Sequence, residues 1–153
     1  MEEHAQSRPP ALSKRRPSPI PPAYQDAKEL TDAILQAAWS KNAFETCVLD
    51  ISKIADFASR FVILSGRSDR HVLAIADAIE AAMKERGVLP VGVEGRRAGT
   101  WVLMDYGDVI VHLFERDTRT FYDLERLWSD AEPVAVTEPQ WVQDFARMEA
   151  GTF

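Results

Sequence analysis

The sequence predicts a single α/β domain with a mixed β-sheet flanked by helices. Three observations lead to this fold class. The chain has 153 residues, of which 46% are hydrophobic, and this suits one domain with one core. Segments with helical apolar spacing alternate with short apolar, β-branched runs. One predicted helix is long enough for a crossover between strands, whereas the last two strands are joined by a short turn, so parallel and antiparallel pairs are both expected.

The first 25 residues are predicted to form a disordered, proline-rich, basic tail. Residues 1–24 contain six of the nine prolines, with four basic and two acidic side chains. Proline fixes φ and removes a backbone donor, and the segment has too few apolar side chains to offset the entropy of ordering. The net charge of −6 thus divides into +2 for this segment and −8 for the rest. An acidic body argues against a broad phosphate-binding face, so sequence-specific binding of nucleic acid is not expected.

Two helices are predicted in the first half of the remaining chain. Residues 26–42 have apolar side chains three and four positions apart. Residues 68–87 repeat this spacing, with Ser68 as the N-cap and Gly87 as the left-handed residue after the helix end. The apolar stripe of the second helix consists of Val72, Ile75, Ala76, Ile79 and Met83. We expect this stripe to face the core.

Five strands are predicted around the second helix. Residues 46–51 and 61–64 are short apolar runs that suit strands buried on both faces. Residues 89–94, 100–104 and 109–114 supply the other three strands. The last two are separated by four residues, in which Gly107 supplies the positive φ of a hairpin turn. These two strands should therefore pair antiparallel.

A short helix is predicted over residues 119–128, which complete a domain spanning residues 26–131. Its expected buried stripe consists of Phe121, Leu124, Leu127 and Trp128.

Residues 132–153 are predicted to be a C-terminal extension with a short amphipathic helix. Thr137 and Gln140 have the spacing of a capping box. The apolar residues that follow are Trp141, Val142, Phe145 and Met148. We expect this stripe to dock on the domain itself, because an apolar helix face needs a cover.

The sequence gives little support for metal, cofactor or thiol chemistry. His4, His71 and His112 lie in the predicted tail, a helix and a strand, which is too scattered for a metal site. Cys47 lies in an apolar run and is expected to be a buried structural thiol. No run approaches the roughly 18 to 20 apolar residues of a membrane-spanning helix, and the first residues lack the order of a secretory signal. A cytoplasmic protein without a membrane or cofactor is expected.

One arrangement favours catalysis as the alternative function. A predicted strand ends at Ser65-Gly66, and the helix that begins at Ser68 leaves backbone N–H groups that can receive an anion. Asp105 and Asp108 are suitable ligands for a divalent metal, so together these features outline a nucleotidyltransferase site. However, aspartates are common at hairpin turns for conformational reasons, and Asp69 would place a negative charge beside any phosphate.

A protein-binding patch is the other interpretation of the hairpin. Trp101, Leu103 and Asp105 share one face of their predicted strand. If this face is exposed, its apolar residues form the centre of a patch with an acidic rim, which suits a basic protein partner. If a helix covers the tryptophan, the same residues belong to the core. The residue pattern leaves both open.

Five motifs occur together in a characteristic order. They are Asp69-Arg70-His71-Val72 with Ala74-Ile75-Ala76-Asp77, then Glu94-Gly95, the unbroken run from Trp101 to Phe114, Arg119, and Phe121-Tyr122-Asp123-Leu124-Glu125-Arg126-Leu127-Trp128. In order and spacing they resemble the ribosomal silencing factors, also called the Iojap-like family, over residues 26–131. One departure is Ser59-Arg60, where the family usually has an acidic residue and an aromatic.

The resemblance implies a fold similar to a minimal nucleotidyltransferase domain without its catalytic carboxylates, and so a protein that is not an enzyme. It implies a translational repressor that binds the large ribosomal subunit through the fourteenth protein of that subunit. Occupying that face would sterically block association with the small subunit when nutrients are short. A homodimer of the free protein is a further family-level expectation. The expected partner-binding residues are Glu94, Trp101, Leu103, Asp105, Tyr106 and Asp108.

Overall fold

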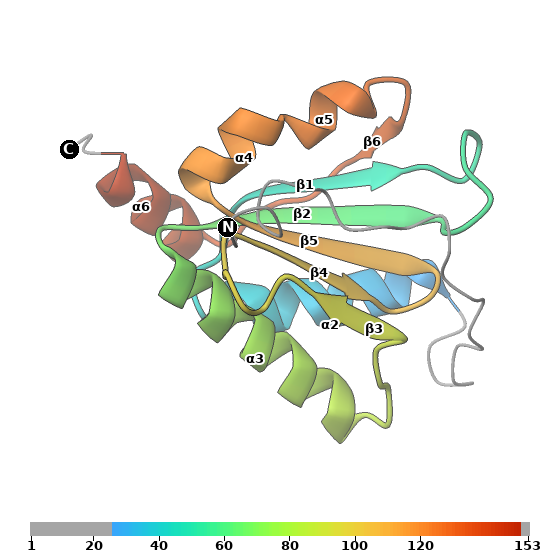
Figure 1. The fold of residues 1–153 in the computed structure, drawn as a ribbon, viewed down its shortest axis with the longest axis horizontal. Coiled ribbons are helices and arrows are strands. Elements are labelled where there is room, and N and C mark those ends of the chain that lie inside the picture. Colours follow the sequence, from blue (N-terminus) through green and yellow to red (C-terminus); the bar gives the residue numbers. More distant parts are fainter. Residues whose placement is uncertain (1–25, 151–153) are drawn as a thin grey trace.

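The computed structural model describes residues 26–150, and the predicted disordered tail lies outside this range. One mixed sheet of six strands, in the order β3-β4-β5-β2-β1-β6, forms the centre of this part of the chain (Figure 1). The strands are β1 (Phe44–Asp50), β2 (Arg60–Gly66), β3 (Gly92–Glu94), β4 (Trp101–Asp105), β5 (Val109–Glu115) and β6 (Glu132–Val134). Only β2 and β5 pair in parallel, and the other neighbours are antiparallel. The predicted fold class is confirmed.

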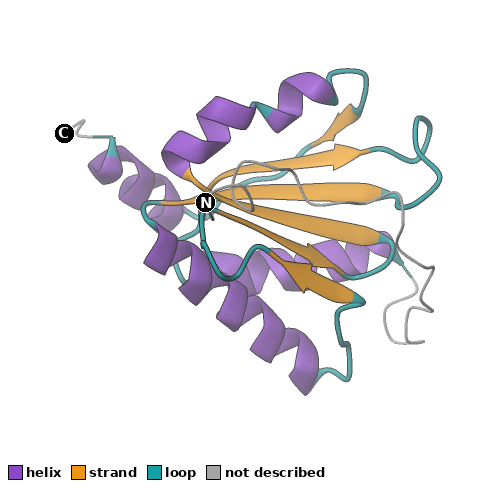
Figure 2. Cartoon of the chain, in the orientation of Figure 1, coloured by secondary structure: helices purple, strands orange, loops and turns teal. Residues whose placement is uncertain are grey.

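Helices cover both faces of the sheet (Figure 2). On one face lie α2 (Ala27–Trp39) and α3 (Asp69–Glu85), and on the other lie α4 (Arg116–Tyr122) and α5 (Leu124–Leu127). The helix α6 (Gln140–Glu149) packs at one end of the sheet. Because side chains alternate along a strand, β2 contributes Val62 and Leu64 to the core under α2 and α3, and Phe61 and Ile63 to the core under α5. The sheet therefore separates two apolar clusters.

The predicted boundaries of α3 and of the hairpin are confirmed. The Ser68 hydroxyl accepts a hydrogen bond from the His71 N–H, and Gly87 has a φ of 78°. β4 and β5 pair antiparallel, with Asp105 opposite Ile110, and Gly107 has a positive φ in the turn between them. β3 is shorter than predicted, because residues 89–91 do not join the strand.

The helix predicted over residues 119–128 is interrupted. Asp123 has a φ of 50° and a ψ of 53°, a left-handed conformation that ends α4 and starts α5. The break puts the residues before it and after it out of helical phase, so they do not share one face, and the predicted buried stripe is wrong for two of its members. Phe121 is 78% exposed and Leu127 is 76% exposed, whereas Leu124 is buried.

Leu124 and Leu127 form a matched pair for a stability measurement. We expect Leu124→Ala to lower the free energy of unfolding by about 2 to 5 kcal/mol, because its side chain fills the core under α5. Leu127→Ala should change it by less than about 0.5 kcal/mol, because that side chain is in solvent. Guanidinium chloride unfolding of both variants checks the pair. Equal losses would contradict the phase break at Asp123.

The C-terminal segment completes the sheet and docks on the domain. β6 pairs antiparallel with β1, and Val142 of α6 is fully buried in the core that α2 and α3 cover. The Phe145 ring lies 5.9 Å from that of Phe44 and 5.6 Å from that of His71. Docking of the amphipathic helix on the domain itself is thus confirmed.

The capping box predicted for this helix is wrong. Pro139 occupies the N-cap, and it provides no side-chain hydrogen bond. Glu138 bonds elsewhere: its Oε2 accepts from the Thr46 N–H at 2.8 Å and from the Thr46 hydroxyl at 2.6 Å. The local pattern resembles a cap, but the Glu138 carboxylate accepts hydrogen bonds from Thr46 of β1, which lies 92 residues away in the sequence.

Candidate partner-binding surface

The sheet register separates the two halves of the nucleotidyltransferase site considered above. In the parallel pair of β2 and β5, Arg60 lies opposite Val109 and Gly66 lies opposite Glu115. The hairpin aspartates precede Val109, whereas the anion-receiving turn follows Ser65 at the other end of β2. Six residue steps along a strand span roughly 20 Å. The aspartates and the turn therefore cannot act on one bound nucleotide phosphate and its metal.

The N-terminus of α3 is also occupied by the protein's own side chains. The Arg67 N–H donates to Nδ1 of His71 at 2.9 Å, and the Arg70 N–H donates to the Asp69 carboxylate at 2.8 Å. The Ser68 hydroxyl caps the next turn. The N–H groups of Arg67, Arg70 and His71 are thus already used, so this turn is a capped helix start.

The hairpin aspartates have structural partners. The Asp105 carboxylate accepts from the Gly107 N–H at 2.8 Å, which fixes the turn. The Asp108 carboxylate accepts from the Ser59 hydroxyl, and its carbonyl accepts from the N–H groups of Ser59 and Arg60. Ser59-Arg60, the departure from the family pattern, thus holds the hairpin against the start of β2. Within residues 26–150, no group of three or more His, Cys, Asp or Glu side chains is placed to hold a metal ion.

Four of the six predicted partner-binding residues share one face of the sheet. Glu94 of β3 lies opposite Leu103 of β4, and Trp101 and Asp105 lie two positions to either side of Leu103. Glu94 is exposed at the sheet edge. Tyr106 is not on this face and belongs to the core under α2 and α3. Asp108, beyond the turn, is partly exposed.

Trp101 and Leu103 are not an exposed apolar centre, and that expectation is corrected. Trp101 is 7% exposed and Leu103 is 2% exposed. The Trp101 ring packs 4.6 Å from Phe114 and 4.8 Å from Tyr122, which ends α4, and its Nε1–H donates to Nδ1 of His112 at 3.2 Å. A helix residue thus covers the tryptophan, as in the second of the two interpretations. The role of these residues in partner binding stays a prediction.

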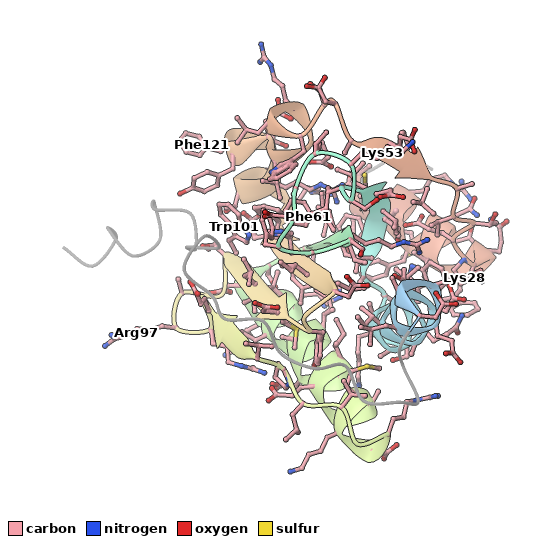
Figure 3. All side chains as sticks on the ribbon, turned by 90° about the vertical axis from the view of Figure 1, so that its right-hand side faces the viewer. Lys28, Lys53, Phe61, Arg97, Trp101 and Phe121 are labelled. Atoms are coloured by element: carbon pink, nitrogen blue, oxygen red, sulfur yellow. The ribbon has the colours of Figure 1, made fainter. Side chains whose placement is uncertain are left out.

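A column of aromatic rings leads from this core to the surface. Phe114 contacts Trp101, Trp101 contacts Tyr122, and the Tyr122 ring lies 5.1 Å from that of Phe121. Phe121 is exposed and extends outward, on the same side of the molecule as Arg97 of the loop between β3 and β4 (Figure 3). We call Phe121, Tyr122 and Trp101 the aromatic column. Helical periodicity assigned Phe121 to the core together with Leu124, so sequence reasoning missed its exposure; the left-handed Asp123 between them takes the two out of phase.

His112 lies beneath the column and is held neutral by burial. Its Nδ1 accepts the Trp101 N–H, so the ring proton belongs on Nε2. Among the described residues, Nε2 has no hydrogen-bond partner. The His112 and Phe61 rings pack edge to face, with their centroids 4.6 Å apart. Burial lowers the pKa of His112 to about 3.

The folded protein should therefore lose stability in mild acid. Below an unfolded pKa of about 6.5, the unfolded chain binds a proton at His112 that the folded protein does not bind until near pH 3. From pH 7 to pH 5 the free energy of unfolding should fall by about 2 kcal/mol from this group. His71, whose pKa burial also lowers, adds a loss of the same sign. Denaturant unfolding at both pH values checks this, and an unchanged pH dependence in His112→Gln would contradict it.

Comparisons with known proteins place this architecture in a family. A family model described as "Ribosomal silencing factor during starvation" matches residues 24–151. The ribosomal silencing factor RsfS of Bacillus subtilis is 39% identical over 104 residues, which cover 68% of this chain and 88% of that protein. The mouse protein named "Mitochondrial assembly of ribosomal large subunit protein 1" is 32% identical over 117 residues, covering 74% of this chain and 51% of that protein. A crystal structure of a Chromobacterium violaceum protein superposes with a TM-score of 0.67 at 35% identity, covering 74% of this chain and 96% of that one.

The fold and the surface define an α/β domain in which the polar groups that resembled a catalytic site serve as caps and turn supports. None of the helices in the described range has the length and apolar character needed to cross a membrane. The chain belongs to the ribosomal silencing factor family. The family match extends through residue 151, and so includes the segment after residue 131 that contributes β6 and α6.

Proposed function

We propose that this protein is a translational repressor that binds the large ribosomal subunit through its fourteenth protein and sterically blocks joining of the small subunit. Family membership is the observation that carries the proposal, because it makes ribosome-associated regulation of translation the function class. The mouse relative, named for assembly of the ribosomal large subunit, supports the choice of subunit.

The chemistry of the surface supports a basic protein partner. Residues outside the first 24 have a net charge of −8, which favours association with a basic surface over bare RNA. Phe121 gives this surface an exposed aromatic anchor on a packed aromatic base, the kind of residue that dominates binding energy at interfaces. We propose the aromatic column as the centre of the contact.

The six residues predicted from the sequence take different parts in this proposal. Glu94 and Asp108 have accessible side chains and form the acidic rim. Trp101 and Leu103 support the surface from beneath. Asp105 shapes the hairpin through Gly107, and Tyr106 anchors the hairpin in the core under α2 and α3.

Occlusion without catalysis is testable by stoichiometry. Free large subunits are incubated with increasing protein, small subunits are added, and joining is followed by light scattering. We expect inhibition to end at about one copy per large subunit without nucleotide or metal, and preassembled ribosomes to resist, because the protein and the small subunit compete for one surface. Full inhibition at a small fraction of one equivalent would indicate a modifying enzyme and overturn the proposal.

The exposed ring should carry a large share of the affinity. We expect Phe121→Ala to weaken binding to isolated large subunits by about 2 kcal/mol, roughly thirtyfold, with the unfolding free energy unchanged. Trp141→Ala is the control, because Trp141 is also an exposed aromatic but lies on α6. Cosedimentation gives both affinities. Equal effects of the two substitutions would place the contact elsewhere.

A homodimer of the free protein stays a prediction, which sedimentation equilibrium tests.

A further inference from the structure

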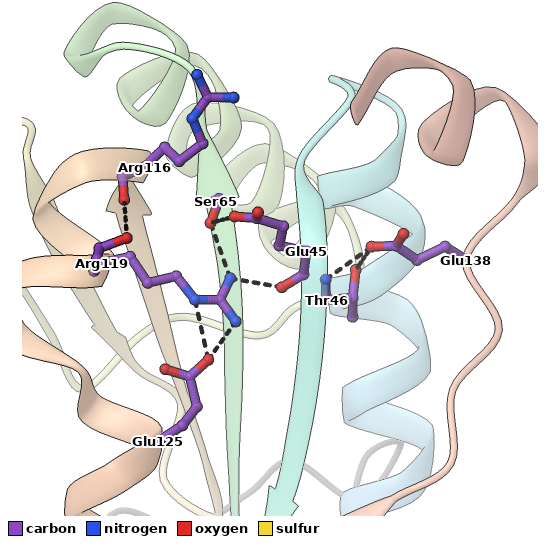
Figure 4. Close-up of polar contacts among 8 residues, drawn as sticks. Glu45, Thr46, Ser65, Arg116, Arg119, Glu125 and Glu138 are labelled. Carbon is purple, nitrogen blue, oxygen red and sulfur yellow. Dashed lines mark hydrogen bonds and ion pairs between the residues drawn. The ribbon is translucent and has the colours of Figure 1, made fainter. Parts of the chain in front are cut away.

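One arginine joins the two helices of the partner-binding surface to the sheet. The Arg119 side chain, on α4, is 12% exposed. Its Nη1 donates to the Glu45 carbonyl of β1 at 2.6 Å and to the Ser65 hydroxyl of β2 at 2.9 Å, and its Nε and Nη2 donate to the Glu125 carboxylate of α5 (Figure 4). A single guanidinium thus bonds two strands and α5.

The acceptors are held in place by an irregularity in β1. Phe44 lies opposite Ser65 and Cys47 lies opposite Ile63, so Glu45 and Thr46 share one partner position in a β-bulge. Glu45 has a φ of 54°, which is uncommon for a residue other than glycine. The bulge releases backbone groups from the ladder: the Glu45 carbonyl accepts from Arg119, and the Thr46 N–H donates to the Glu138 carboxylate. The Ser65 hydroxyl donates to the Glu45 carboxylate and so accepts from Arg119.

Apolar packing of α4 is confined to its last residue, Tyr122, which packs on Trp101. This helix has no buried residue, and α5 has only Leu124. Phe121 and Tyr122 are the last residues of α4, and the left-handed Asp123 follows them at once. The Asp123 N–H donates to the Arg119 carbonyl. Arg119 therefore bonds both to the sheet, through its side chain, and to the turn that follows Phe121 and Tyr122, through its backbone.

We propose that Arg119 is the positioning residue of the partner-binding surface: it fixes α4 and α5 on the sheet and so sets the place of Phe121 and Tyr122. This inference rests on the proposed function. Arginine suits the role because its planar fork places donors on three separate nitrogens in fixed directions. A lysine ammonium has its three donors on one nitrogen and does not reproduce this spread.

The test compares Arg119→Lys, which keeps the charge, with Arg126→Lys, which changes an exposed arginine of α5. Two quantities are measured on the full chain: affinity for isolated large subunits, and amide hydrogen exchange resolved by segment. We expect Arg119→Lys to weaken affinity about tenfold and to speed exchange in α4 and α5 about tenfold, as loss of a charge-assisted bond would, with exchange in α3 unchanged. Arg126→Lys should change neither.

Several results would overturn the inference. One is affinity within about twofold of the parent in Arg119→Lys. Another is equal loss of protection in α3 and α4, which would make Arg119 a general stabiliser. Glu125→Gln keeps the shape of the side chain and weakens its ion pair with Arg119. It must therefore lower the affinity and speed exchange in α4, as Arg119→Lys does. This second variant tests the inference even if Arg119→Lys folds poorly. Failure of the parent protein itself to bind large subunits would refute the proposed function, and is read separately from the variants.

Discussion

Trp101→Ala is expected to lower the free energy of unfolding by about 3 to 5 kcal/mol, the range for a buried aromatic side chain. The ring packs between Phe114 and Tyr122 and donates to His112, so its removal leaves a cavity and an unused acceptor under α4. Binding to large subunits should fall as well, because Tyr122 loses its support. Both measurements are needed, since an interface tryptophan would lose only binding.

Trp141→Ala provides the contrast for Trp101→Ala. Its side chain is 55% exposed and makes one hydrogen bond, to the Trp39 carbonyl at 3.3 Å. We expect a loss of about 1 kcal/mol or less. Denaturant unfolding of the two variants under the same conditions separates the two positions. A Trp101→Ala protein with the stability of the parent and weakened binding would return Trp101 to the exposed patch first considered.

Gly95→Ala is expected to be at least as disruptive, although it adds only a methyl group. A Cβ at this position would lie 1.9 Å from the Trp101 carbonyl oxygen, and φ is 90°. The backbone of the loop or of β4 has to move, so we expect a cost of about 3 kcal/mol or more. Because β4 begins at Trp101, the shift should also disturb the aromatic column.

Two other glycines separate the causes of this effect. Gly87 has a φ of 78° with no atom within 4 Å of an added Cβ, so Gly87→Ala should show backbone strain alone, about 1 to 2 kcal/mol. Gly92 has open space and no positive φ, so Gly92→Ala should stay within about 0.5 kcal/mol of the parent. Thermal or denaturant unfolding gives the order of the three. A Gly95→Ala protein no less stable than Gly87→Ala would contradict the close contact with Trp101.

The parts of the fold that were predicted correctly are those fixed by local pattern. The helix α3 has a cap, a stripe and a terminal glycine within one segment, and the β4–β5 hairpin has its turn residue between two apolar runs. β6 was missed because Glu132-Pro133-Val134 is short and contains proline, which a sheet tolerates at its edge, and β6 is an edge strand.

The candidate surface was less predictable for a physical reason. Phe121 was predicted to share a face with Leu124, and the left-handed Asp123 between them, which no periodicity encodes, separates the two. The polar anchors act over long separations: Arg119 reaches Glu45 across 74 positions and Ser65 across 54. The tertiary structure brings such partners together, so the spacing of residues in the sequence predicts neither the bond from Arg119 to Glu45 nor the bond from Arg119 to Ser65.

The bond between Glu138 and Thr46 has a consequence for how the chain folds. The strand that closes one edge of the sheet, and the helix that seals one end of its core, come last in chain order, yet they attach to β1, which comes first among the strands. Contacts between such distant segments form late, because a long loop must close before they contribute stability. During synthesis, which proceeds from the N-terminus, the edge of β1 that pairs with β6 has no hydrogen-bond partner until β6 has been made. Completion of the sheet is therefore tied to synthesis of residues 132–149, and the nascent domain exposes this edge to other chains until then.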